Sequence, residues 1–353
     1  MIVLIDGLPA SGKSLVRGML DNHSKVFSCP FHDLLPLTFT SPNLDYEALK
    51  AKDTEWLRSQ LSKSARYYRI ERIASQEEFH FDIGGGEVKS FPVNLDFYSF
   101  DRMFMSFLRS IEEWTPQNII EACYKVLNCE LYGKINCEKR VYATLGNGEI
   151  HSPRKFLERF PDGKVIYFNR DIESIVAALC ERPPQPGNYR TRENEHKKIF
   201  KNRIVSGIVQ ESLEKKIELD RLFREFPVKV LLLDFDSFFD DFEVTKKKIA
   251  HFLGIPVEKS MDEFSFIGSK MPKTSGSGYF DKPIDNKESI LSSDERNLIG
   301  FLYNPTFTGL FGLALNREFF YLAVEAYLNS YKKKAKNYFL NKFLKKPLFS
   351  GVR

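Results

Sequence analysis

The chain has 353 residues, of which 42% are apolar and 14% aromatic, enough to build a sizeable core, so we do not expect a disordered protein. No stretch approaches the ~18–20 consecutive apolar residues of a membrane-spanning helix, and the first apolar run, Ile2 to Ile5, is too short for a signal peptide. The expected location is therefore cytoplasmic.

The net charge of +5 is concentrated at the C-terminal end. Residues 331–353 carry eight basic side chains and no acidic one, so the rest of the chain carries −3. Aromatic and leucine side chains lie between these basic residues, a pattern found both in solvated helix ends and in basic amphipathic helices at anionic membrane surfaces or near nucleic acid. We expect a solvated basic helix or tail, with weak membrane-surface contact as the alternative and no nucleic acid partner.

The cysteines form an odd set of five with no C-x-x-C spacing, which argues against a disulfide framework and against a zinc site. We expect reduced thiols packed as small buried hydrophobic side chains, and no metal. The five are Cys29, Cys123, Cys129, Cys137 and Cys180.

The N-terminal segment predicts a strand, a loop and a helix. Ile2–Ile5 is an apolar run typical of a buried strand, and Leu15, Met19 and Leu20 recur at near-helical spacing after a glycine-containing turn. The stretch from Leu20 to Ser28 then leads from the end of the helix into a second short strand.

Residues 41–135 differ in composition from the segments around them. They are rich in aromatic and charged residues, contain few runs typical of parallel strands, and include a probable-turn sequence at Gly84-Gly85-Gly86. We predict a mainly helical insertion in this part of the chain. Its aromatic residues are expected chiefly in core packing, with stacking on the rings of a ligand as the alternative; they include Trp56, Tyr67, Tyr68, Tyr98 and Trp114.

Two later strands are each followed by a helix. Lys164–Phe168 precedes a helical pattern through Leu179, and Val228–Leu233 precedes a helix over about Phe242–Leu253. Strands that alternate with helices predict a parallel sheet covered on both faces. The predicted fold class is therefore α/β, with three layers and a central parallel sheet.

The remaining segments complete the predicted organisation. We expect a long polar helix over Glu193–Phe226, a loop over Gly268–Asp285, and a mostly helical stretch from Ser292 to about Leu344 with a break at Asn304-Pro305. Residues 1–330 are predicted to form a single domain, and residues 331–353 a basic C-terminal helix or tail.

The residues from Gly7 to Ser14, Gly-Leu-Pro-Ala-Ser-Gly-Lys-Ser, match the phosphate-loop pattern in full. The match lies directly after a predicted strand and directly before a predicted helix, the context in which such loops occur. Glycines let the backbone approach a phosphate, the loop N–H groups point inward, and the start of the helix favours an anion. Lys13 adds a positive charge and Ser14 a hydroxyl, so we expect a bound nucleotide phosphate.

Three stretches beyond the loop indicate a particular family. The first is Leu20-Asp21-Asn22-His23-Ser24-Lys25-Val26-Phe27-Ser28, and the second runs from Phe160 to Asp171, a strand that ends in Asn169-Arg170-Asp171. The third is the stretch from Leu231 to Phe239 followed by His251-Phe252-Leu253-Gly254-Ile255-Pro256. Together with the loop they resemble the bacterial and Golgi-type sulfotransferases, whose loop helix ends in a similar Leu-Leu-Asp-x-His-Pro-x-Val phrase. The resemblance covers about two thirds of the chain, the part that forms the core.

The resemblance implies a cofactor, 3′-phosphoadenosine 5′-phosphosulfate. Arg170 would then meet its 3′-phosphate, and a late basic, glycine-containing loop over Lys270 to Tyr279, which includes Lys273, would cover it. The chain departs from the family at three positions: Ala10 replaces a basic residue, Lys13 replaces a threonine, and Ala178 replaces a serine for which Ser174, one helical turn earlier, is a substitute. The implied cofactor-binding residues are Pro9, Ala10, Ser11, Gly12, Lys13, Ser14, Arg170, Ser174 and Lys273.

The resemblance also places a general base just after the second strand. His32 is the first choice, because an imidazole pKa near ~6.5 suits proton removal near neutral pH, and Asp33 is the second. Lys13 would stabilise the negative charge that develops on the leaving oxygen. The family implies a sugar or glycolipid acceptor, with a peptide tyrosine or a small alcohol as alternatives.

Two other functions stay open at this point. A phosphate-loop kinase that uses ATP and magnesium is supported by the intact Gly-Lys-Ser ending and by Asp234, an acid after an apolar strand that is suited to magnesium. A non-catalytic nucleotide-sensing or membrane-tethered protein is supported only by the basic tail and by the altered family positions.

Overall fold

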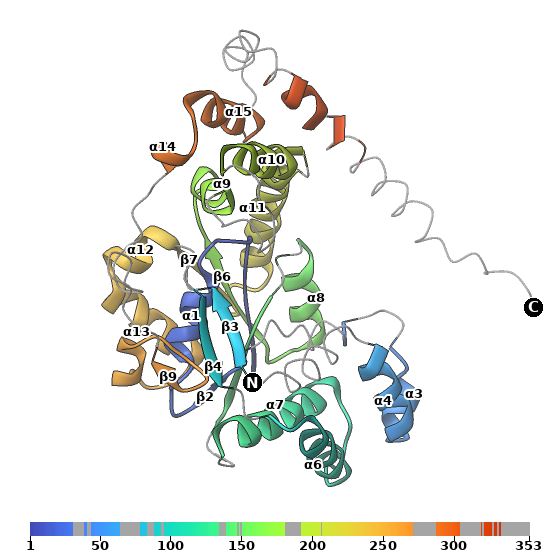
Figure 1. Cartoon of the computed structure of the whole chain (residues 1–353). Coiled ribbons are helices and arrows are strands. Elements are labelled where there is room, and N and C mark those ends of the chain that lie inside the picture. Colours follow the sequence, from blue (N-terminus) through green and yellow to red (C-terminus); the bar gives the residue numbers. More distant parts are fainter. Residues whose placement is uncertain are drawn as a thin grey trace, which may run out of the picture. The chain divides into compact units, whose positions relative to one another are not determined.

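The computed structural model describes residues 1–30, 39–40, 44–63, 78–82, 88–92, 95–133, 139–146, 148, 150–180, 192–205, 207–270, 287–303, 319, 321–326, 328–329 and 332. Figure 1 shows the elements that these residues form. In chain order they are β1 (Ile2–Gly7), α1 (Lys13–Leu20), β2 (Val26–Ser28), α3 (Tyr46–Lys50), α4 (Thr54–Lys63), β3 (Glu78–Asp82), β4 (Val88–Pro92), α6 (Phe97–Arg109), α7 (Pro116–Tyr132), β5 (Val141–Leu145), α8 (Ser152–Arg159), β6 (Lys164–Asn169), α9 (Ile172–Cys180), α10 (Arg192–Val205), α11 (Ile208–Glu225), β7 (Val230–Asp234), α12 (Phe235–Asp240), α13 (Phe242–Leu253), η1 (Lys259–Asp262), β8 (Ser265–Phe266), β9 (Ser269–Lys270), α14 (Lys287–Ile290) and α15 (Ser293–Tyr303).

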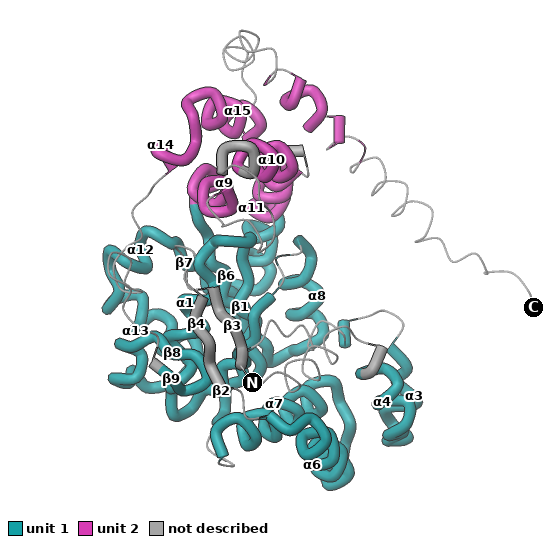
Figure 2. The backbone as a smooth tube through the Cα atoms, viewed as in Figure 1, with its two compact units in different colours: residues 1–170, 218–284 teal, residues 171–217, 285–353 magenta. Residues whose placement is uncertain are grey.

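The chain divides into two compact units, coloured separately in Figure 2. The first comprises Met1–Arg170 and Glu218–Ile284, and the second comprises Asp171–Ile217 and Asp285–Arg353. The phosphate loop and the sheet belong to the first unit. The single domain over residues 1–330 and the basic tail over 331–353 stay predictions.

A five-stranded parallel sheet forms the centre of the first unit, in the order β2-β5-β1-β6-β7. Strand β1 pairs with both of its neighbours: Val3 lies opposite Ala143 of β5 and Lys164 of β6. The loop that follows β1 therefore starts from the middle of the sheet's carboxyl edge, where ligands of open α/β sheets bind. The predicted α/β class with a central parallel sheet is confirmed.

Helices cover both faces of this sheet, because the side chains of β1 alternate between two apolar clusters. Ile2 and Leu4 lie in one cluster with buried residues of α6, α7 and α8. Val3 and Ile5 lie in the other with residues of α1, α12 and α13. All four side chains are at most 1% exposed, which is why the strand is a continuous apolar run rather than an alternating one.

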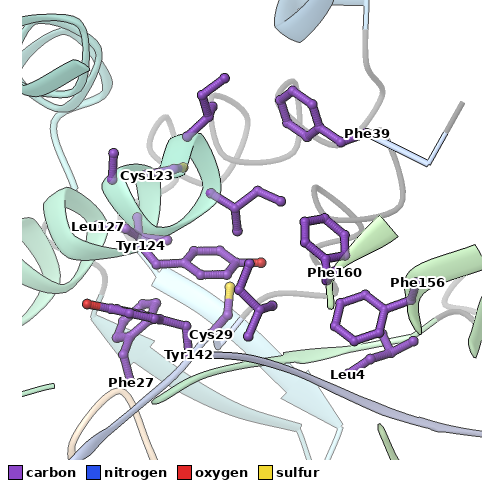
Figure 3. Close-up of a cluster of buried hydrophobic side chains, with 14 of the residues drawn as sticks. Leu4, Phe27, Cys29, Phe39, Cys123, Tyr124, Leu127, Tyr142, Phe156 and Phe160 are labelled. Carbon is purple, nitrogen blue, oxygen red and sulfur yellow. The ribbon is translucent and has the colours of Figure 1, made fainter. Parts of the chain in front are cut away.

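Aromatic rings dominate the cluster around Leu4 (Figure 3). The ring of Tyr124 on α7 lies 5.7 Å from that of Phe27 on β2 and 6.2 Å from that of Tyr142 on β5. Each such ring contributes about 1.5–3 kcal/mol through burial. Cys29 and Cys123 also lie in this core. None of the described cysteines forms a disulfide; these are Cys29, Cys123, Cys129 and Cys180.

The elements predicted from apolar runs are confirmed. Strands β1, β6 and β7 overlap the predicted runs, β2 is the short strand predicted after the loop helix, and α13 has the predicted bounds. Helix α15 begins at Ser293 and ends at Tyr303, directly before the predicted break at Asn304-Pro305, which itself lies outside the described residues.

Three parts of the first 226 residues differ from the sequence prediction. Strand β5 was missed, although it lies between β2 and β1. The insertion contains the antiparallel pair β3 and β4 besides its predicted helices; the predicted turn at Gly84-Gly85-Gly86 lies outside the described residues. The long helix predicted over Glu193–Phe226 is wrong, because α10 ends at Val205 and α11 begins at Ile208, with Gly207 at a left-handed φ of 83° between them.

The predicted loop over Gly268–Asp285 begins with strand β9, which pairs with β8. Residues 271–286 lie outside the described residues. In the part of the chain that the structure describes, no helix is both long enough and apolar enough to cross a membrane.

The carboxylate of Asp21, at the end of α1, joins three segments of the first unit. It accepts hydrogen bonds from the Tyr132 hydroxyl, the Ser265 hydroxyl and the Gly268 N–H, each at 2.8 Å. Burial raises the pKa of this carboxyl, and the three donors together with Arg17 offset part of that rise. Asp21 thus holds α7 and the β8–β9 hairpin against the helix that carries the phosphate loop.

We expect Asp21→Ala to lower the free energy of unfolding by about 2–4 kcal/mol, because it removes the shared acceptor of the Gly268 N–H and of the Tyr132 and Ser265 hydroxyls. Denaturant unfolding measures the change. Asp220→Ala, which removes an exposed carboxylate on α11, is the matched control and should change stability by less than about 0.5 kcal/mol. Equal effects of the two substitutions would contradict the structural role of Asp21.

Candidate phosphate-binding site

Residues 8–12 form a tight loop between β1 and α1. The Ser11 N–H donates to the Leu8 carbonyl at 3.1 Å, and the Leu15 N–H donates to the Gly12 carbonyl at 2.8 Å. Two residues have left-handed backbone, Ala10 with φ of 62° and Gly12 with φ of 97°. The chain thereby reverses from the centre of the sheet into the first turn of α1 within five residues.

Two glycines, Gly7 at the end of β1 and Gly12 at the end of the loop, are required by the packing of the loop. A Cβ at Gly7 would lie 2.5 Å from both the Phe168 carbonyl oxygen and the Ser11 Oγ. A Cβ at Gly12 would lie 2.8 Å from ring atoms of Phe235. The close approach of the loop backbone to β6 and α12 is therefore possible only because both positions lack a side chain.

The polar side chains of the loop gather at its base. Lys13 is 9% exposed, and its Nζ donates to the Gly7 carbonyl at 3.1 Å. The Ser11 hydroxyl is buried and has no hydrogen-bond partner among the described residues. A buried hydroxyl without a partner costs free energy that a bound oxygen atom would recover.

Arg170 follows the last residue of β6 and lies against the loop. Its Nη1 donates to the Ala10 carbonyl at 3.1 Å, and its guanidinium lies 4.1 Å from the centre of the Phe235 ring. Ala10 has left-handed backbone, which costs an alanine about 1–2 kcal/mol. Arg170 contacts the carbonyl of this same residue. A second cation thus stands beside the loop, held by a backbone oxygen and an aromatic face.

The start of α1 favours an anion. Its first turn contains no acidic residue, and among the described residues no side chain caps the N–H groups at Gly12. Helix N-termini with uncapped amides bind phosphate and sulfate groups. The sequence-predicted residues Pro9, Ala10, Ser11, Gly12, Lys13 and Ser14 all lie in this one loop, and the orphaned hydroxyl, the two required glycines and the buried ammonium fit an anionic cofactor.

Ser174 has a structural partner in the second unit. Its N–H and its hydroxyl both donate to the Asp171 Oδ2 at 2.9 Å, which caps the start of α9. Burial raises the pKa of Asp171, but these bonds and the Lys287 ammonium outweigh it and bring the pKa below its usual value. Ser174 as a substitute for the serine missing at Ala178 stays a prediction, since the loop belongs to the first unit.

The general bases suggested by the resemblance, His32 and Asp33, lie outside the described residues, and so does Lys273. Their roles stay predictions. Of the loop neighbours that the structure does describe, Asp6 and Phe235 were not singled out in the sequence.

Asp6 is the last residue of β1 before Gly7, and it is fully buried. Its Oδ1 accepts from the Gly148 N–H at 3.0 Å, while its Oδ2 has no partner within the described part of the chain. A Cβ at Gly146 would lie 2.5 Å from Oδ1, so the segment after β5 is shaped around this carboxylate. The sequence signal that could have pointed to Asp6 is an acidic residue at the end of an apolar run, one position before the phosphate-loop pattern.

Asp234, the acid considered for magnesium, caps a helix instead. Its side chain accepts from the Ser237 N–H at the start of α12. It ends β7, the edge strand, which is separated from β1 by β6. No cluster of three His, Cys, Asp or Glu side chains suited to a metal occurs in the described residues. The geometry does not favour the kinase alternative.

His23, in the phrase that resembles the sulfotransferases, supports the end of α1. Its Nδ1 accepts from the Lys25 N–H at 3.0 Å, so Nε2 carries the proton and donates to the Pro256 carbonyl at 2.9 Å. The imidazole is fully buried. His23 therefore joins the loop helix to the segment after α13, a packing role.

Comparisons with known proteins give structural neighbours only. No family model and no curated protein matches the sequence. The structure is similar to the sulfotransferase domain from the curacin biosynthetic pathway (14% identity, 85% of this chain and 96% of that one, TM-score 0.42). It is also similar to the sulfotransferase domain of the Synechococcus PCC 7002 olefin synthase (14%, 74% and 75%, TM-score 0.39) and to a sulfotransferase of Mycobacterium tuberculosis H37Rv (11%, 74% and 69%, TM-score 0.35).

Proposed function

We propose that the chain is a sulfotransferase that moves a sulfuryl group from 3′-phosphoadenosine 5′-phosphosulfate to a hydroxyl acceptor. The observation that supports this most is the pair of cations at the loop. Lys13 contacts the Gly7 carbonyl and Arg170 contacts the Ala10 carbonyl, each at 3.1 Å. This donor carries phosphate at both its 5′ and its 3′ positions, so its recognition calls for two separated cationic groups.

The two cations divide the work of binding. Lys13, Ser14 and the N–H groups at the start of α1 would hold the 5′-phosphate end, where the loop and the helix dipole favour negative charge. Arg170 would hold the 3′-phosphate, since a planar guanidinium pairs well with phosphate oxygens. The Phe235 ring, 4.1 Å from the guanidinium, would fix the orientation of Arg170.

The same residues provide the chemistry. The bound donor supplies an activated sulfuryl group and a good leaving group. Lys13 with the loop amides would stabilise the negative charge that the leaving group would gain on transfer of the sulfuryl group to the acceptor oxygen. His32 or Asp33 would take the acceptor proton. Fixed cations and dipoles would thus perform the neutralisation for which kinases use magnesium.

The acceptor is proposed to be a sugar or a glycolipid head group, taken up near the insertion. Among the aromatic residues considered there, Trp114 is 5% exposed and its Nε1 donates to the Leu108 carbonyl at 2.9 Å, which assigns it to the core. Tyr98 at the start of α6 is 84% exposed and is available for stacking on a sugar ring.

Thermal unfolding with added nucleotides tests the proposal. We expect 3′-phosphoadenosine 5′-phosphate to raise the melting temperature without magnesium. At a ligand concentration a hundred times its dissociation constant, the increase should correspond to about 2.7 kcal/mol of stability. ADP, and ATP with magnesium, should raise it less. Adenosine 5′-monophosphate is the matched control, because it lacks only the 3′-phosphate.

The variant Arg170→Ala sharpens this test. This variant should bind 3′-phosphoadenosine 5′-phosphate and adenosine 5′-monophosphate about equally, because it lacks the guanidinium that would contact the 3′-phosphate. Stronger stabilisation of the unmodified protein by ATP with magnesium than by 3′-phosphoadenosine 5′-phosphate would overturn the proposal in favour of a kinase.

A further inference from the structure

Asp6 places a carboxylate inside the core, directly before the phosphate loop. The side chain is fully buried, and its Oδ2 has no hydrogen-bond partner among the described residues. Residues 7–14, which form the loop pattern, contain no acidic side chain. Burial of a carboxylate without an opposite charge costs free energy, because the surrounding protein does not replace the water that would solvate it. An acid kept in this position therefore indicates a role at the loop.

The neighbouring strands hold this carboxylate in place. The Gly148 N–H donates to its Oδ1 at 3.0 Å, and a Cβ at Gly146 would lie 2.5 Å from the same oxygen. On the other side of β1, Asp6 lies opposite Tyr167 of β6. Burial raises the pKa of the Tyr167 hydroxyl, and the charge of Asp6 raises it further. These three neighbours are neutral, so none of them cancels the charge of Asp6, and water screens it poorly.

A negative charge beside the loop distinguishes two kinds of terminal group on a bound nucleotide. A terminal sulfate carries one negative charge, whereas a terminal phosphate carries nearly two at pH 7, because its second pKa is about 6. Lys13 and the loop amides attract both groups, and a buried carboxylate repels the phosphate more strongly. Repulsion of this kind separates ligands that share the same attractive contacts.

We propose that Asp6 is a specificity-determining residue whose buried charge disfavours nucleotides that end in phosphate and favours a donor that ends in sulfate. The inference rests on the proposed function and deepens it, because it concerns the class of donor that the loop accepts. It explains how a loop with the Gly-Lys-Ser ending of the kinases would discriminate against ATP. Magnesium would reduce the repulsion by neutralising the phosphates, so the test is made with and without it.

Calorimetry with adenosine 5′-phosphosulfate and ADP tests the proposal, since the two nucleotides differ only in their terminal group. Asp6→Asn removes the charge and keeps an oxygen that accepts from the Gly148 N–H. Without magnesium, the dissociation constant of ADP divided by that of adenosine 5′-phosphosulfate should fall on the order of tenfold, the effect of one unit charge at an effective dielectric constant of ~20. Asp6→Ala, a second neutral variant, should lower this ratio similarly. Melting temperatures show whether both variants are folded.

Asp234→Asn is the matched control. Asp234 also ends a strand of the sheet, and its side chain also accepts from a backbone N–H, that of Ser237. It is exposed, however, and it ends the edge strand β7, which β6 separates from β1. Loss of its charge should leave the ratio of the two dissociation constants unchanged.

Four results would overturn the proposal. These are an unchanged ratio in both Asp6 variants, an equal change in Asp234→Asn, no binding of either nucleotide, and ADP binding that magnesium strengthens in the unmodified protein but not in Asp6→Asn. The last result would make the carboxylate a metal ligand. Failure of the proposed function is seen separately, because the unmodified protein would then be stabilised more by ATP with magnesium than by 3′-phosphoadenosine 5′-phosphate.

Discussion

Lys13→Ala should lower turnover on the order of a hundredfold or more, the effect of losing one preorganised group that stabilises transition-state charge. The side chain is buried at the base of the loop, with Nζ 3.1 Å from the Gly7 carbonyl oxygen, so its charge is poorly screened by water. Turnover is measured as release of 3′-phosphoadenosine 5′-phosphate with a panel of sugar and alcohol acceptors. The effect should fall mainly on kcat, because Ser14, Arg170 and the loop amides still bind the donor.

The control for this prediction is Lys247→Ala, which removes an exposed lysine on α13. It should leave turnover unchanged. Lys13→Ala itself should cost no more than about 0.5–1.5 kcal/mol of stability, the value of one hydrogen bond, so a melting curve separates loss of chemistry from loss of fold. A variant that turns over at a near-normal rate would remove Lys13 from the mechanism.

The phosphate loop and most of the sheet could be predicted because their signals are local. Glycines at fixed spacing, an apolar run before them and a helical pattern after them lie within about twenty residues of one another. The same holds for β6 and β7, whose apolar runs are each followed by a helix. Buried parallel strands give continuous apolar runs, which are easy to recognise in a sequence.

Strand β5 gives a weaker signal, although it is central to the sheet. Val141–Leu145 is short, includes a threonine, and follows the charged pair Lys139 and Arg140. Its place between β2 and β1 comes from pairing with segments more than a hundred residues away, which no local pattern encodes. Gly146 and Gly148 follow this strand because the Asp6 carboxylate lies against them: it leaves no room for a Cβ at Gly146 and accepts from the Gly148 N–H.

The contacts of Arg170 were likewise beyond sequence reasoning. Its position at a strand end predicted a place at the carboxyl edge of the sheet, and the structure adds the two contacts that hold it, the Ala10 carbonyl and the Phe235 ring. Phe235 follows β7, the neighbour of β6, so the stacking partner of Arg170 comes from a different strand end. A loop residue, a strand-end cation and an aromatic ring from separate parts of the sequence thus form one site.

Gly12→Ala should disrupt this arrangement more completely than loss of any single charge. The new Cβ would lie 2.8 Å from the Phe235 ring and 3.1 Å from the Phe168 ring, and the φ of 97° is unfavourable for alanine. Backbone strain of about 1–2 kcal/mol and overpacking of about 1–3 kcal/mol both act on the loop. The loop amides and Phe235, and with Phe235 the guanidinium of Arg170, would have to move.

The expected result is a loss of more than about tenfold in affinity for 3′-phosphoadenosine 5′-phosphate, measured by calorimetry, with a lower melting temperature. Gly254→Ala separates the two causes, because Gly254 has a φ of 67° but no atom within 4 Å of its Cβ position. Gly254→Ala introduces backbone strain without a steric clash, and it should keep the full affinity for 3′-phosphoadenosine 5′-phosphate. Phe235→Leu added to Gly12→Ala should restore part of the lost stability by relieving the contact, without restoring the stacking on Arg170. Unchanged affinity in Gly12→Ala would show that the loop does not hold the phosphate.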